Sequence, residues 1–191
     1  MNNFLDFEKP IADLEGKIRE LEGLEDGSDI EIKEDIAKLR QKALQQLEQT
    51  YAKLTPWQKT QVARHVDRPK LNDITARLID DFTPLAGDRA FADDKAIIGG
   101  LGRFRGRSVV VIGTEKGKDT ETRLRHNFGM ARPEGYRKAQ RLMQMADHFG
   151  IPILTFIDTS GAYPGIGAEE RGQAEAIARS IEVCLDVRVP M

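Results

Sequence analysis

The chain has 191 residues, of which 40% are hydrophobic, so it is long enough to bury the core of one domain with an appendage. Its 29 Lys and Arg residues against 31 Asp and Glu residues argue against a nucleic-acid binder or a polybasic membrane surface. The single cysteine, Cys184, excludes an internal disulfide and a zinc site, and the sequence shows neither a signal peptide nor a membrane-spanning apolar run, so we expect a soluble, cytoplasmic protein without a metal of its own.

Two segments near the N-terminus repeat apolar residues every three or four positions, which predicts two amphipathic helices. Turn-forming residues at 23–29 join them, so we predict a helical hairpin as domain 1–52 and assign 53–191 to a second domain. Residues 11–50 contain eleven acidic and six basic side chains, and we expect an acidic, solvated face that also docks a partner. The apolar residues are Ile11, Leu14, Ile18 and Leu21, then Ile32, Ile36, Leu39 and Ala43.

Two short helices are expected next. Thr55 before Pro56 is typical of an N-cap and first helical position, which predicts a helix to about Arg64. Asn72 or Asp73 is expected to cap another helix, to about Asp80.

After these helices, the spacing of apolar residues changes from one typical of helices to one typical of strands. Segments 96–104 (AIIGGLGRF) and 108–114 (SVVVIGT) are predicted to form two strands joined by a tight turn at Gly106.

A helix is expected to begin at Pro133 and to end at Gly150. The apolar run at 151–158 is typical of a strand that helices cover on both faces. The expected apolar face of the helix consists of Tyr136, Ala139, Leu142, Met143, Ala146 and Phe149.

After a Gly- and Pro-rich loop, Glu169 and Glu170 are expected to open a last helix, to about Val183. Residues 188–191 are similar to the start of another strand. We therefore expect an α/β domain that is truncated at its C-terminus, with a sheet edge lacking its next neighbour.

The main candidate site is the loop 158–167 (DTSGAYPGIG), at the carboxyl end of the last predicted strand. Ligands of open α/β sheets bind in this position, and glycine N–H groups near a helix start suit an anion or oxyanion. A long turn without a ligand is the alternative. Ser160 lacks the G-x-S-x-G context of a hydrolase, and residues 113–120 depart from the P-loop pattern, so neither activity is predicted.

The three histidines, His65, His126 and His148, lack the spacing of metal ligands. Residues 116–141 contain eight basic and three acidic side chains. This stretch either forms a solvated face or partner contact, or binds a carboxylate or a coenzyme phosphate.

Four segments resemble the alpha subunit of the bacterial multisubunit acetyl-CoA carboxylase carboxyltransferase: 4–18, 85–100, 126–146 and, above all, 155–178 (TFIDTSGAYPGIGAEERGQAEAIA). The resemblance implies a crotonase-like α/β fold, a spiral of stacked ββα units that is incomplete here and follows the helical hairpin. It also implies an α2β2 assembly in which the beta subunit carries zinc, and partnership with the biotin carboxyl carrier protein and biotin carboxylase.

The activity that this resemblance implies is transfer of the carboxyl group from carboxybiotin, on the carrier protein, to acetyl-CoA. The product would be malonyl-CoA for fatty acid synthesis. Five residues carry over by resemblance as the biotin and carboxylate site: Gly161, Ala162, Tyr163, Gly165 and Lys116.

Two departures from the family pattern matter. The family usually has proline where this chain has Ser160, and its oxyanion glycines are expected beyond Met191. We therefore assign no catalytic residue and expect this chain alone to be inactive.

Two other functions stay open. A stand-alone acyl-CoA hydratase or isomerase of the crotonase superfamily would need a positioned Glu or Asp base, which the Gly-rich loop lacks. A non-catalytic assembly module would act through the acidic hairpin.

Overall fold

The computed structural model describes residues 3–24 and 30–191, in two compact units, Met1–Arg68 and Pro69–Met191. The unit boundary falls after the helix that begins at Pro56, so this helix belongs to the first unit. None of the described helices is both long enough and apolar enough to cross a lipid bilayer.

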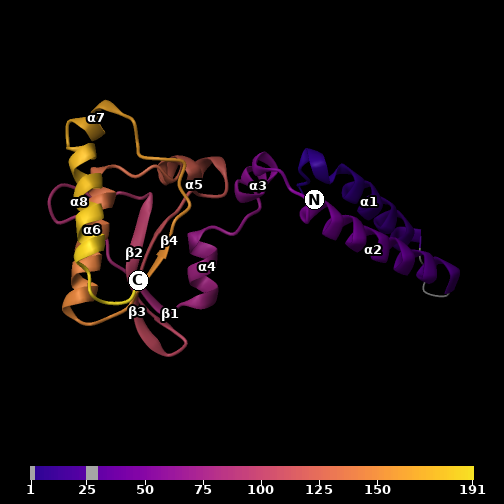
Figure 1. The fold of residues 1–191 in the computed structure, drawn as a ribbon, viewed down its shortest axis with the longest axis horizontal. Coiled ribbons are helices and arrows are strands. Elements are labelled where there is room, and N and C mark those ends of the chain that lie inside the picture. The colour runs from indigo at the N-terminus through magenta and orange to yellow at the C-terminus, as the bar shows by residue number, and fades with distance from the viewer. Residues whose placement is uncertain (1–2, 25–29) are drawn as a thin grey trace. The chain divides into compact units, whose positions relative to one another are not determined.

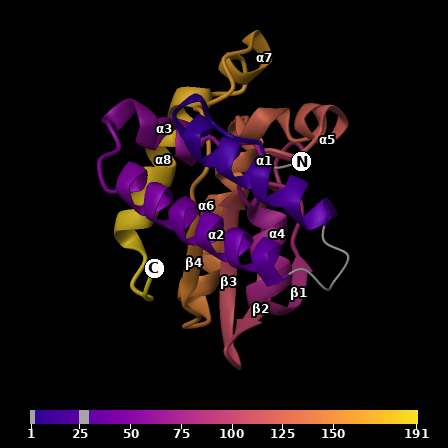
Figure 2. The ribbon, with the colours of Figure 1, turned by 90° about the vertical axis from the view of Figure 1, so that its right-hand side faces the viewer.

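The first unit is helical. Its two long helices, α1 (Lys9–Leu24) and α2 (Ile30–Tyr51), run side by side, as predicted (Figures 1 and 2). Ile11, Ile18 and Ile36 are buried between them. The predicted turn at 23–29 lies mostly outside the described residues. Two shorter elements complete the unit, η1 (Asp6–Glu8) and α3 (Pro56–Ala63).

Hydrogen bonds at the helix ends close this unit. Glu8 is buried and accepts the Leu5 N–H at 2.7 Å and the Tyr51 hydroxyl at 2.5 Å, which joins η1, directly before α1, to the end of α2. That hydrogen bond, together with burial, raises the pKa of Tyr51 to about 12. Thr55 caps α3 as predicted, because its hydroxyl accepts the Gln58 N–H.

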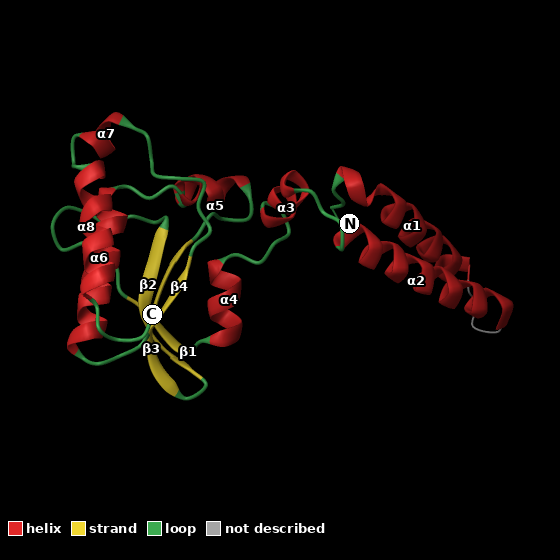
Figure 3. Cartoon of the chain, in the orientation of Figure 1, coloured by secondary structure: helices red, strands yellow, loops and turns green. Residues whose placement is uncertain are grey.

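The second unit has one four-stranded sheet, whose strands are yellow in Figure 3. The strand order in this sheet is β1-β2-β3-β4. Strands β1, β2 and β3 are antiparallel neighbours, and β4 is parallel to β3. The elements are α4 (Leu71–Leu78), β1 (Asp80–Pro84), β2 (Ile97–Phe104), β3 (Arg107–Thr114), α5 (Thr120–Arg125), η2 (Asn127–Gly129), α6 (Pro133–His148), β4 (Ile153–Phe156), α7 (Ile166–Glu169) and α8 (Gln173–Asp186).

The predicted hairpin of β2 and β3 is confirmed. Arg105 and Gly106 both have positive φ, 50° and 78°, as a two-residue hairpin turn requires. Gly100 allows β1 to approach, since a Cβ atom there would lie 2.2 Å from the Thr83 carbonyl oxygen. Strand β1 itself is absent from the sequence-based prediction.

Apolar side chains cover both faces of the sheet. On one face, Leu142 and Met143 of α6 pack against Val110 and Ile153. On the other face, Val109 and Val111 lie in a second cluster with Ile79, Phe82, Phe104, Leu154 and Phe156. Figure 1 shows α6 and α8 on one side of the sheet and α4 on the other.

Two helix predictions need correction. Lys70, rather than Asn72 or Asp73, is the N-cap of α4, and the Asp73 carboxylate accepts the Lys70 N–H at 2.9 Å. Phe149 is 67% exposed instead of lying on the apolar face of α6, because the helix ends at His148 and the chain turns away.

The last helix and strand also differ from the predictions. Glu169 ends α7, and α8 begins only after Gly172, whose φ of 79° breaks the helix. Strand β4 is an edge strand, so only Ile153 in it is buried. The terminal segment forms no strand, although the Pro190 carbonyl accepts the Ile153 N–H at 2.9 Å.

Candidate functional site

Lys116 and the start of the predicted loop meet at one edge of the sheet. Because β3 and β4 are parallel, the residues that follow them emerge together. The Lys116 ammonium lies 2.6 Å from the Asp158 carboxylate, in a pair that is about one-third exposed at Asp158 and less at Lys116. The structure thus places Lys116 beside the loop, with its charge already paired.

Thr159 shapes the first half of the loop. Its hydroxyl lies 2.7 Å from the Gly129 carbonyl oxygen and accepts the Gly161 N–H at 3.0 Å. Gly161 has a φ of 148°, which side chains rarely adopt, and no atom lies near the place of a Cβ. The exposed backbone at Ser160 and Gly161 therefore depends on glycine for its conformation and not for space.

The second half of the loop is tied to the segment before α6. Ala162 forms a parallel bridge with Ala131, and the Tyr163 N–H donates to the Ala131 carbonyl at 3.0 Å. The buried Gln173 amide donates to the carbonyl oxygens of Ala131 and Tyr163, at 3.0 and 3.2 Å. Sequence reasoning missed Gln173, which anchors the loop from the first turn of α8.

The ring of Tyr163 is closely confined. A Cβ atom on Gly165 would lie 2.3 Å from the ring, so a larger residue there would displace the outer end of the Tyr163 side chain. The Arg132 guanidinium lies 4.8 Å from the centroid of the Tyr163 ring, in a cation–π contact. Of the five predicted residues, Lys116 thus lies at Asp158, Gly161 is held by Thr159, and Ala162 and Gly165 lie next to Tyr163 in the second half of the loop.

Buried charges that the sequence did not point to surround the first group. Glu115 is 2% exposed, and its two oxygens accept the N–H groups of Gly117 and Asn72 at 2.8 and 2.9 Å. Lys70 is 8% exposed. Burial lowers the pKa of Lys70, and the positive charges of Lys116 and Arg123 add to this, while Asp158 and Glu115 oppose it.

Besides Lys116, half of the eight basic side chains in the stretch 116–141 make ion pairs or hydrogen bonds within the fold. Arg137 pairs with Asp88 at 3.0 Å, and Lys138 with Asp93 at 2.6 Å. The other examples are Lys118, which pairs with Asp73, and Arg141, which donates to the carbonyl oxygens of Leu85, Ala86 and Gly87. These four side chains make contacts within the fold, a role that neither alternative from the sequence had named, and Lys138 is too buried to belong to a solvated face.

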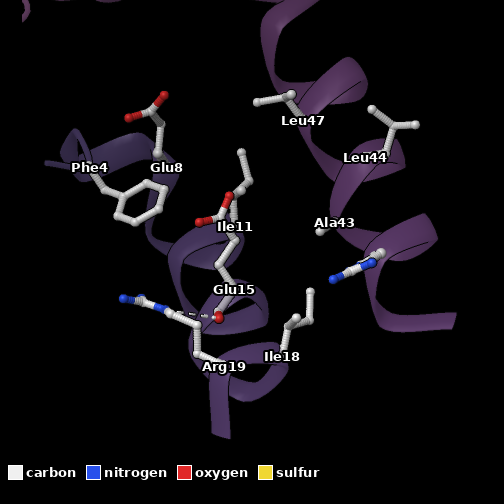
Figure 4. A pocket seen from close by; sticks show the side chains of 10 residues that line it. Phe4, Glu8, Ile11, Glu15, Ile18, Arg19, Ala43, Leu44 and Leu47 are labelled. Carbon is white, nitrogen blue, oxygen red and sulfur yellow. Dashed lines mark hydrogen bonds between the residues drawn. The ribbon is translucent and has the colours of Figure 1, made fainter. Parts of the chain in front are cut away.

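Residues of the loop 158–167 do not line the cavities described next. The groove between α1 and α2 encloses about 520 Å³, and Ile11, Ile18, Leu44 and Leu47 point into it (Figure 4). Two cavities in the second unit, of about 180 and 290 Å³, share Asp93, Asp94, Lys95 and Arg125 in their linings. In residues 3–24 and 30–191, no three His, Cys, Asp or Glu side chains are grouped to hold a metal ion.

Solved structures share this fold. The chain matches the transcarboxylase 12S core with a TM-score of 0.53 and 21% identity, over 66% of this chain and 23% of that one. It matches the beta subunit of geranyl-CoA carboxylase from P. aeruginosa with a TM-score of 0.50 and 24% identity, over 63% and 20% of the two chains. The fold is therefore the crotonase-like α/β fold of carboxyltransferases, as predicted.

The chain belongs to the acetyl co-enzyme A carboxylase carboxyltransferase-like family, whose model matches residues 4–191. It is 70% identical, over 99% of its length, to the acetyl-coenzyme A carboxylase carboxyl transferase subunit alpha of Paramagnetospirillum magneticum. The corresponding subunit of Rhodospirillum centenum is 68% identical, also over 99% of the chain. The chain spans 60% of the length of each of these two relatives.

Proposed function

We propose that this chain acts as the alpha subunit of an acetyl-CoA carboxylase carboxyltransferase. In that role it helps to transfer the carboxyl group from carboxybiotin, on the biotin carboxyl carrier protein, to acetyl-CoA, which gives malonyl-CoA for fatty acid synthesis. The observation that carries the proposal is the 70% identity to such a subunit over 99% of the chain.

The proposed biotin site is the loop after β4, with Gly161, Ala162, Tyr163 and Gly165 as its wall. Carboxybiotin supplies the carboxyl group and, once that group has left, a ureido anion that can accept a proton from the acetyl methyl group. The chain's part is to present a fixed surface to this ring. The fit of Tyr163 against Gly165 and the Gln173 hydrogen bonds support such a surface.

The proposed partners complete the enzyme. A zinc-bearing beta subunit would form the α2β2 heterotetramer and supply most of the acyl-CoA site, and biotin carboxylase would recharge the carrier protein. We place the oxyanion-binding glycines of the alpha subunit in the part of the relatives' length that this chain does not span. A cytoplasmic location follows from this role.

The proposal is tested on a subunit of the relatives' full length, co-expressed with a beta subunit, by measuring malonyl-CoA formation from acetyl-CoA and carboxylated carrier protein. We expect Lys116→Glu to raise KM for the carrier about tenfold, since the change removes a cation and places a carboxylate beside Asp158. KM for acetyl-CoA should stay constant.

The control is Lys118→Glu, an exposed lysine two positions away whose partner, Asp73, lies on α4. No malonyl-CoA from the wild-type assembly would refute the function. Unchanged kinetics in Lys116→Glu alone would remove only Lys116 from the site.

A further inference from the structure

We propose that a cavity lined by Arg125 and Arg132, beside the loop 158–167, receives an acidic side chain of the biotin carboxyl carrier protein. This inference rests on the proposed function and extends it, because it names the surface on which the carrier protein docks. A contact next to the loop would keep the tethered biotin ring at a high effective concentration there.

The cavity has a volume of about 180 Å³. Its wall comes from the segment before β2, the end of α5, the start of α6 and Arg171, which lies between α7 and α8. It adjoins the loop through Arg132, whose guanidinium lies 4.8 Å from the centroid of the Tyr163 ring. Pockets for drug-sized ligands begin at roughly 300 Å³, so this cavity suits one small group such as a carboxylate.

The three carboxylates in the cavity wall already have partners. Asp93 and Glu134 form ion pairs with lysine and arginine side chains of the same unit. Asp94 accepts three backbone N–H groups. These carboxylates are therefore engaged elsewhere and do not pair with Arg125 or Arg132.

The guanidinium groups of Arg125 and Arg132 are exposed and lack an anionic partner. Within residues 3–24 and 30–191, the Arg125 side chain makes no hydrogen bond or ion pair, and the Arg132 side chain makes only its contact with the Tyr163 ring. Stacking on a ring occupies the flat face of a guanidinium and leaves its N–H edge for an acceptor. Two such groups in one wall suit a carboxylate, which accepts paired hydrogen bonds from arginine.

Two exposed apolar side chains also line this cavity. Phe91 is 67% exposed and Leu124 is 64% exposed. The Arg171 guanidinium lies over the Phe91 ring, 4.8 Å from its centroid. Aromatic and arginine side chains are enriched in protein interfaces, and a free anion would leave Phe91 and Leu124 in water. The cavity therefore favours an acidic side chain that a protein surface presents over a free phosphate or carboxylate.

The test uses a subunit of the relatives' full length, assembled with a beta subunit, in the variants Arg125→Glu, Arg132→Glu and Arg125→Lys. Malonyl-CoA is the carboxyl donor, and either the carrier protein or free biotin is the acceptor. We expect each Glu variant to lower the ratio of kcat/KM for the carrier to kcat/KM for free biotin about tenfold, because free biotin lacks the docking surface. Arg125→Lys should keep most of the ratio, since the charge remains.

The matched control is Arg107→Glu. Arg107 is exposed and begins β3, at the end of the sheet opposite to the loop, so its replacement should leave the ratio as in wild type.

A binding measurement separates this inference from the proposed function. Unbiotinylated carrier protein, labelled with ¹⁵N, is titrated with the assembly and followed by NMR. We expect signals of acidic carrier residues to shift with the wild-type assembly, and the affinity to fall about tenfold with Arg125→Glu and at high salt. If the wild-type assembly makes no malonyl-CoA, the proposed function fails, yet this titration still decides where the carrier docks.

Three results would overturn the inference. The first is an unchanged ratio and unchanged carrier binding in Arg125→Glu and Arg132→Glu. The second is loss of the beta subunit from the purified Glu variants, because the cavity would then belong to the contact between subunits. The third is loss of inorganic phosphate binding in Arg125→Glu with unchanged carrier binding, which would assign the cavity to a free anion.

Discussion

Two glycines inside helices show how neighbours decide the effect of one methyl group. Around Gly16 in α1, nothing lies within 4 Å of the place of a Cβ atom. At Gly135 in α6, that Cβ would lie 2.8 Å from the Asp94 carboxylate and 2.9 Å from Ile97. Asp94 cannot withdraw easily, because its oxygens accept the N–H groups of Ala96, Ile97 and Arg132.

We therefore expect the two alanine substitutions to have opposite signs. Gly16→Ala should raise the free energy of unfolding by about 0.5–1 kcal/mol, because a helix position with open space at the Cβ gains helix propensity. Gly135→Ala should lower the free energy of unfolding by about 1–3 kcal/mol, because the added carbon would crowd Asp94 and Ile97. Urea denaturation measures the free energy of unfolding of both variants. Equal stabilisation in the two would show that Asp94 moves aside without cost.

At the scale of elements, Asp93 connects the segment before β2 to α6. Its carboxylate accepts hydrogen bonds from Lys138 at 2.6 Å, from Lys95 at 2.7 Å and from the Gly87 N–H at 2.8 Å. Burial alone would raise the pKa of Asp93, but these hydrogen bonds prevail and lower it to about 2.

This pKa predicts acid sensitivity. Because the pKa of Asp93 in the folded state lies below its ordinary value of 3.8, the carboxylate stabilises the fold above about pH 4 and loses this effect as the pH falls toward 2. Asp93→Asn should lower the free energy of unfolding by about 1–3 kcal/mol at pH 7. The difference from wild type should shrink between pH 4 and pH 2, and a constant difference would contradict the assignment.

Elements with a strong local pattern were predictable from the sequence, and those set by neighbours were not. Two short apolar segments with a turn at Gly106 predicted the hairpin of β2 and β3, and Pro133 predicted the start of α6. Strand β1 was missed because its sequence, DDFTP, is polar and ends in proline, and pairing with β2 alone makes it a strand. The start of α8 was wrong because the left-handed Gly172 separates it from α7.

In the candidate site, too, some features were predictable from a local sequence pattern and others depend on neighbouring elements. Position after an apolar strand identified the loop, but its meeting with Lys116 depends on the parallel register of β3 and β4. Lys70 carried no sequence signal, since its burial results from the attachment of α4 to Glu115.

At the scale of the whole molecule, the two units have separate cores. Ile11, Ile18 and Ile36 are the buried aliphatic side chains of the described helical unit, and α6 with the sheet forms the core of the other. Separate cores favour separate local unfolding.

Tyr51→Phe tests this separation. Loss of its hydrogen bond to Glu8 should destabilise the helical unit by about 1 kcal/mol. Amide hydrogen exchange should then accelerate in α1 and α2 and stay unchanged in β2, β3 and α6. Faster exchange throughout both units would show that they unfold as one.

Gln173 gives the loop an unusual mechanical dependence. Its amide nitrogen donates to the carbonyl oxygens of Ala131 and Tyr163, so three stretches of backbone share one side chain at the first residue of α8. A displacement of that helix along its axis would therefore be transmitted to Tyr163, and a ligand that shifts Tyr163 would in turn pull on the helix.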